Sequence, residues 1–103
     1  MAPRASKPKS TATIPEDVAD QVRAAIDGFQ DPALNAGLRG RFCYILHRGQ
    51  PICRLGFRPG EDLWDFAIYK YSTGTYSSSD IFLPRKAPLT EGIRTALLAY
   101  DLA

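Results

Sequence analysis

The fold is decided by residues 41–57, which read RFCYILHRGQPICRLGF. Apolar side chains recur at every second position on both sides of Arg48 and Gly49, which is the period of a β-strand. The stretch therefore predicts two antiparallel strands joined by a short turn. With a two-residue loop through Gly49, one face of this hairpin is predicted to form the apolar core layer. That layer consists of Phe42, Tyr44, Leu46, Cys53, Leu55 and Phe57.

The same register assigns the basic side chains to the opposite face of the hairpin. That face carries Arg41, His47, Arg54 and Arg58. Cys43 and Cys53 then point to opposite faces, which excludes a disulfide between them, whereas a three-residue loop would reverse this arrangement. We interpret both cysteines as structural residues.

Two further strands are predicted after the hairpin. Beyond a Pro-Gly turn at residues 59–62, Trp64, Phe66 and Ile68 alternate with polar or small residues, which indicates the longest strand. Past another turn, residues 76–83 predict a weaker edge strand that ends before Pro84.

A helix is predicted on each side of these strands. Residues 14–27 repeat apolar positions at helical spacing, with Thr13 as N-cap and Glu16 completing a capping box. Residues 89–102 repeat the helical spacing, and residues 30–40 are interpreted as a connector with room for one helical turn. The order α-β-β-β-(β)-α predicts a two-layer α+β domain, with an antiparallel sheet of three to four strands and both helices on one face.

Length and composition limit the class of protein. A chain of 103 residues, 45% hydrophobic and 23% charged, holds one small domain, which we place at residues 13–103. Residues 1–12 hold three basic residues, no acid and two prolines, which predicts a disordered basic tail. No apolar run approaches the roughly 18 residues of a membrane span, and no signal peptide is recognisable. We expect a cytoplasmic protein, monomer or dimer, with no membrane partner.

Positive charge is concentrated in the hairpin. Residues 39–58 contain five arginines and no acid, although the net charge of the chain is only +2. Tyr69 and Tyr71 are predicted to share this surface, and arginines among aromatic rings are typical of sheets that bind single-stranded nucleic acid. The candidate binding residues are Arg41, Arg54, Arg58, Tyr69 and Tyr71.

Two other interpretations of this arginine face stay open. In the first, the arginines form a solvated face and pair with Asp65 and Asp80 on neighbouring strands. In the second, the chain is a regulatory or assembly module that binds an acidic protein through the sheet face or through the edge strand at residues 76–83. Because the tail alone carries +3, residues 13–103 carry a net charge of −1, which is less basic than a typical specific nucleic-acid binder.

The sequence contains no recognisable catalytic or metal-binding motif. His47 is the only histidine and lies roughly 13 Å along the strand from Cys43, too far for a nucleophile and base pair. There is no C-x-x-C pair for zinc. Residues 37–40 match a G-x-x-G loop but lead into a strand, so we interpret them as a turn. We expect a non-enzymatic protein without cofactor or metal.

Three stretches resemble a group of small uncharacterised bacterial proteins. They are CRLGF at 53–57, WDFAIYKYS at 64–72 and PLTEG at 88–92. They are similar to an R-L-x-Y/F strand, a W-x-F-A-x-Y-x-x-S strand and a G-T-P-E-E-A-like helix start. The resemblance covers residues 42–100 and implies a bacterial cytoplasmic source, with no established activity.

Residues 64–103 are also similar to plant ethylene-responsive DNA-binding domains, whose helix ends in an A-Y-D pattern like that at 99–101. This similarity implies a sheet that reads the major groove of DNA. Those domains carry arginines and tryptophans on the reading strands, where this chain has Asp65, Ala67 and Tyr69.

Overall fold

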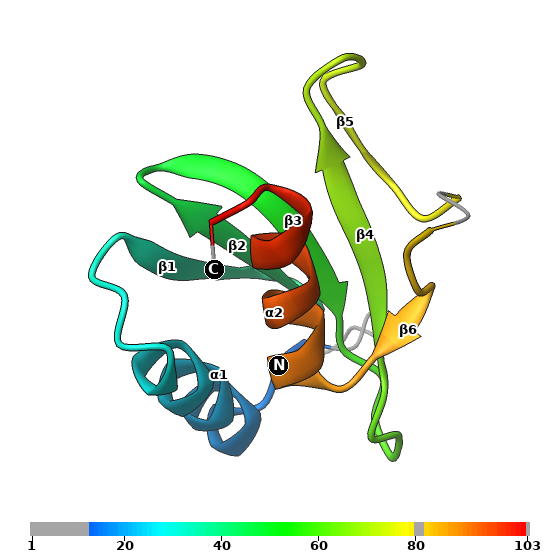
Figure 1. Ribbon diagram of the computed structural model, residues 1–103. Helices are drawn as coiled ribbons and strands as arrows, with labels where there is room; N and C mark the ends of the chain where they lie inside the picture. The colour runs from blue at the N-terminus through cyan, green and yellow to red at the C-terminus, as the bar shows by residue number, and fades with distance from the viewer. Residues whose placement is uncertain (1–12, 80–81, 103) are drawn as a thin grey trace, which may run out of the picture.

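A computed structural model describes residues 13–79 and 82–102, so the predicted tail at residues 1–12 lies outside the described part. The fold is α+β, with a helix on each side of the strands in the chain order, as predicted (Figure 1). The helices are α1 (Glu16–Gly28) and α2 (Leu89–Ala99). The strands are β1 (Leu34–Arg39), β2 (Phe42–His47), β3 (Gln50–Gly56), β4 (Trp64–Lys70), β5 (Thr75–Ser77) and β6 (Lys86–Ala87).

The sheet has six strands, more than the three or four predicted. Strands β1 to β5 lie in chain order, and each pairs antiparallel with the next. β1 occupies most of the segment that was predicted to be a connector, and within residues 37–40 only Gly40 forms a turn. Leu34 is buried and Ala36 is half-buried on the core side, but Asn35 and Gly37 have low strand propensity, which hid this strand in the sequence.

The predicted edge strand at residues 76–83 is divided in the structure. β5 ends at Ser77, and the short strand β6 forms only after Pro84. β5 pairs with residues 68–70 of β4, whereas β6 pairs with Trp64 and Asp65 on the same edge of β4. The ladder along this edge is therefore interrupted at the middle of β4.

The β2–β3 hairpin contains a β-bulge, whereas a regular hairpin was predicted. His47 pairs with Gln50, so the loop has the predicted two residues, Arg48 and Gly49, both with positive φ of 54° and 78°. Beyond the loop, however, the pairing shifts from Leu46–Pro51 to Ile45–Cys53. One extra residue of β3, at position 52, therefore interrupts the regular alternation.

This bulge exchanges the two faces of β2 relative to the prediction. Cys43, Ile45 and His47 face the helices, whereas Phe42, Tyr44 and Leu46 face away from them. The predicted placement of the second set in the core was therefore wrong, and so was the predicted placement of His47 on the arginine face. The two cysteines share the helix side and are buried and free. The physical reason is Pro51, which has no N–H to donate to a regular ladder and is tolerated inside a sheet mainly at bulges.

Both helices cover the same face of the sheet, as predicted (Figure 1). The core between them is apolar, and no polar or charged residue in the described ranges is buried. Its largest fully buried side chains are Val22, Cys43, Ile45, Cys53, Leu55, Phe66 and Ile93. We call the other side of the sheet, on which no helix packs, the open face.

α1 begins at Glu16, later than predicted, whereas α2 begins at Leu89, as predicted. The N-cap of α1 is Pro15, with no side-chain cap, so the predicted Thr13–Glu16 capping box is wrong. α2 begins in the same way after Pro88. A proline holds φ near −65° and thus orients the chain at a helix entry without a capping side chain. Neither helix is long and apolar enough to cross a membrane.

Candidate functional site

A continuous row of six aromatic rings, which we call the ring strip, runs across the open face and ends at Tyr100, which follows α2 and packs against the helix-side core. In order of contact, its members are Phe42, Tyr44, Tyr76, Tyr69, Tyr71 and Tyr100. Successive ring centroids lie 6.1, 5.7, 5.0, 4.8 and 5.9 Å apart, in tilted or edge-to-face geometry. These distances fall within the favourable range for aromatic pairs. The strip contains all five tyrosines of the chain.

Hydrogen bonds hold one end of the ring strip in place. The Tyr71 hydroxyl donates to the Pro51 carbonyl at 2.7 Å, and the Tyr100 hydroxyl donates to the Tyr69 carbonyl. Desolvation raises the pKa of Tyr71 and Tyr100, and nearby phenols add to the effect. These phenols therefore stay protonated near neutral pH and remain donors.

Arg54 stacks on the ring strip. Its guanidinium carbon lies 4.5 Å from the Phe42 ring centroid and 5.0 Å from that of Tyr76. No carboxylate in the described ranges pairs with it. A guanidinium over two rings gives a planar cationic surface that is held by cation–π contact.

Arg41 and Arg58 are engaged with one carboxylate. Arg41 Nη1 lies 3.1 Å from Asp65 Oδ2, and Arg58 Nε lies 2.9 Å from both carboxylate oxygens. Partial burial raises the pKa of Asp65, but hydrogen bonds from Arg58 and Arg41 outweigh it, so its pKa is lowered. The predicted pairing with Asp65 is confirmed for these two arginines, whereas Asp80 lies outside the described residues.

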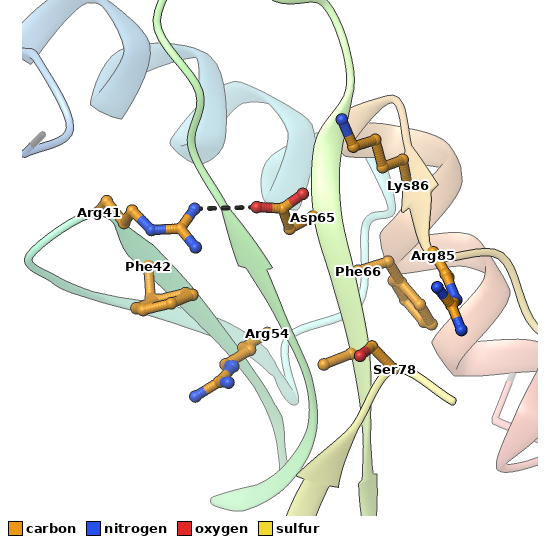
Figure 2. Close-up of a pocket in the computed structure, with 9 residues that line it drawn as sticks. Arg41, Phe42, Arg54, Asp65, Phe66, Ser78, Arg85 and Lys86 are labelled. Carbon is orange, nitrogen blue, oxygen red and sulfur yellow. Dashed lines mark hydrogen bonds and ion pairs between the residues drawn. The ribbon is translucent and has the colours of Figure 1, made fainter. Parts of the chain in front are cut away.

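A pocket of about 330 Å³ opens beside the ring strip, at the interruption in the β4 ladder (Figure 2). We call it the basic pocket, because four cationic side chains line it. They are Arg41, Arg54, Arg85 and Lys86. Asp65 is the one carboxylate among the described lining residues, and Lys86 Nζ lies 3.5 Å from Glu61 at the surface.

The structure brings the five predicted site residues to one side of the sheet, with different surroundings. Arg54 and Tyr69 lie on the open face itself. Arg41 and Arg58 reach it from the turn before β2 and the loop after β3. Tyr71 follows β4 and is 52% exposed.

Sequence reasoning missed several members of this surface. They are Phe42, Tyr44, Tyr76, Arg85 and Lys86. Phe42 and Tyr44 were assigned to the core because the bulge was not included, although Pro51 inside a central strand is a signal for one. Arg85 and Lys86 were missed because the edge strand was predicted to end before Pro84.

His47 lies on the helix side, not on the arginine face as predicted. Its side chain is only 10% exposed, and Nε2 lies 2.9 Å from Asp31 Oδ2. The backbone N–H of Ala33 and the His47 ring lower the pKa of Asp31. This contact ties the connector after α1 to the end of β2.

The histidine, cysteines and carboxylates do not gather at one place. Within residues 13–79 and 82–102, no group of three or more such side chains is arranged to hold a metal ion. Burial raises the pKa of the Cys43 thiol to about 12 and also raises the pKa of Cys53. Neither thiol is therefore a ready nucleophile or metal ligand.

No family model, curated protein or solved structure matches this chain. The resemblances to small bacterial proteins and to ethylene-responsive domains stay predictions. Function is therefore inferred from the open face itself.

Proposed function

We propose that this protein is a non-enzymatic binding module that holds single-stranded nucleic acid on the open face of its sheet. The observation that carries this proposal is the ring strip with Arg54 stacked between Phe42 and Tyr76. Unpaired bases bind proteins by stacking on aromatic rings and guanidinium planes. Each such contact contributes about 1–3 kcal/mol and tolerates any base.

A single strand fits this face better than a duplex does. Four of the rings come from β2, β4 and β5, so they form a broad surface and not a ridge that could enter a groove. Bases in a duplex are stacked on each other and cannot meet these rings. Tyr71 is more than half exposed, and the other rings of the strip are half-buried and keep part of their surface open.

The charge around the ring strip predicts modest electrostatic binding. Arg54 can contact phosphates, and Arg41 and Arg58 can do so only in competition with Asp65, which already engages both. Two or three phosphate contacts predict that affinity falls about 7- to 20-fold between about 50 and 200 mM salt. This loss is smaller than that of a strongly basic nucleic-acid binder.

Fluorescence anisotropy tests the proposal. Labelled single-stranded RNA, single-stranded DNA and duplex DNA are titrated with the full chain at about 50 and 200 mM salt. We expect binding to both single strands and weaker binding to the duplex. Tyr76→Ala should weaken single-strand binding about 5- to 150-fold, the loss of one stacking contact, whereas Tyr76→Phe keeps the ring and should change it less than about twofold.

Arg54→Gln and Arg23→Gln form a matched pair of charge variants. Both remove one positive charge, but Arg23 lies exposed on α1, which packs on the helix side of the sheet, and pairs with Asp20. Arg54→Gln should weaken binding at least about tenfold, and Arg23→Gln should not. If no oligonucleotide binds at low salt, or if the two variants act alike, the proposal is wrong and an acidic protein becomes the partner to seek.

A further inference from the structure

The basic pocket holds more positive charge than its own carboxylate balances. Four cationic side chains and one carboxylate give its described lining a net charge of +3. Asp65 is shared by Arg41 and by Arg58, which does not line the pocket. Arg54 and Arg85 have no carboxylate partner in the described part of the chain. An excess of this kind attracts a multiply charged anion.

The pocket is also formed from several separate segments of the chain. Its cationic walls come from the turn before β2, from β3 and from the segment that enters β6. Figure 2 shows Arg54 and Arg85 on either side of Ser78, with Arg41 turned toward Asp65. A volume of about 330 Å³ lies at the lower end of small-molecule sites, enough for a phosphate group with its sugar.

Arg54 connects this pocket to the ring strip. It stacks on Phe42 and Tyr76, and it also lines the pocket. A strand whose terminal base stacks beside Arg54 therefore has its end next to the pocket. An internal phosphodiester carries one negative charge, whereas a terminal phosphate monoester carries about 1.5 to 2 at pH 7 and offers three acceptor oxygens.

We infer that the basic pocket takes the terminal phosphate monoester of a single strand lying on the ring strip. This inference rests on the proposed function and adds a preference for one chemical end of the strand. Arg85 allows the two claims to be tested separately, because it lines the pocket and does not stack on any ring of the strip. The Ser78 hydroxyl, also in the lining, is placed to donate a hydrogen bond to the same group.

The test compares three versions of one short oligonucleotide, labelled at an internal base. One carries a 5′-phosphate, one a 3′-phosphate and one hydroxyl groups at both ends. We expect one phosphorylated version to bind about tenfold more tightly than the hydroxyl version, the gain of a charged hydrogen-bonded contact. This preference should shrink below about pH 6, where the monoester takes up its second proton.

Arg85→Gln should abolish the preference and change the affinity for the hydroxyl version less than about twofold, whereas Arg23→Gln should leave the preference intact. Thermal unfolding of Arg85→Gln serves as the folding control, since Arg85 is exposed. Equal affinity for the three oligonucleotides, or a preference that survives Arg85→Gln, would overturn the pocket inference and leave the ring strip standing. Failure of all three to bind would instead overturn the proposed function.

Discussion

The two faces of this sheet use the same strands for different purposes. On the helix side, β2, β3 and β4 contribute side chains such as Ile45, Leu55 and Phe66, which are at most 1% exposed. On the open face, the same strands contribute half-buried rings and Arg54. Because strand residues alternate between faces, one face can hold the apolar core while the other stays available for binding. The difference teaches that neighbouring residues of one strand can serve separate ends: those facing the helices stabilise the fold, and those facing away are free for the binding proposed above.

The largest effect should come from the helix side. Phe66→Ala removes a fully buried ring and should lower the free energy of unfolding by about 3–5 kcal/mol, because it loses burial and leaves a cavity. Tyr44→Ala on the open face removes a half-buried ring and should cost about half as much or less. Urea denaturation measures both, and Phe66→Leu is the milder variant if the first does not fold. Equal costs would contradict the division between faces.

Two glycines give a smaller and matched comparison. A Cβ at Gly92 would lie 2.6 Å from Leu55 Cδ2 inside the core, where nothing can move away easily, so Gly92→Ala should cost about 1–3 kcal/mol. A Cβ at Gly56 would lie 2.5 Å from Arg41 Nη1, the end of a half-exposed side chain that can swing outward. Gly56→Ala should therefore cost less than about 1 kcal/mol. Thermal unfolding of the two variants checks the order, and the reverse order would contradict it.

On the open face, the Asp65 carboxylate makes a smaller contribution to the stability of the fold. Asp65→Asn should lower the free energy of unfolding by about 1 kcal/mol at pH 7, since the ion pairs with Arg41 and Arg58 are partly exposed. The folded state lowers the pKa of Asp65, so this contribution is present above the ordinary value of 3.8 and is lost as the pH falls below it. The wild-type protein should thus lose more stability than Asp65→Asn between pH 5 and pH 2.

The same Asp65→Asn variant should bind single strands more tightly, because Arg41 and Arg58 become available to phosphates. Anisotropy at low and high salt measures this gain together with a steeper salt dependence. Unchanged affinity would indicate that these two arginines lie outside the binding surface.

The smallest effect is expected for the reaction of the two thiols with a reagent. This reaction tests the register of the β2–β3 hairpin directly. Both cysteines lie in the core, and at a pKa of about 12 the thiolate fraction of Cys43 at pH 8 is about 10⁻⁴. Neither thiol of the native protein should react with a thiol reagent, and both should react in denaturant. A regular hairpin without the bulge would place Cys43 on the open face and make one thiol reactive.

The sequence predicted the helices and the α+β class because those signals are repeated over many residues. The spacing of Val18, Val22 and Ile26 alone indicates one face of a helix. The register of the hairpin, in contrast, depends on a single extra residue after Pro51. Residue types at the candidate site were visible from the sequence, but their gathering on one face follows from that bulge and from the pairing of β6 with β4.

Ring signals in an aromatic NMR spectrum, recorded while an unlabelled single strand is added, test the central claim most directly. All five tyrosines belong to the ring strip, whereas the single tryptophan, Trp64, lies on the helix side and contacts Phe57. We predict that tyrosine signals, led by Tyr76 and Tyr69, shift on binding while the Trp64 signals stay in place. Movement of Trp64 without the tyrosines, or no movement of any ring, would contradict the assignment of binding to the open face.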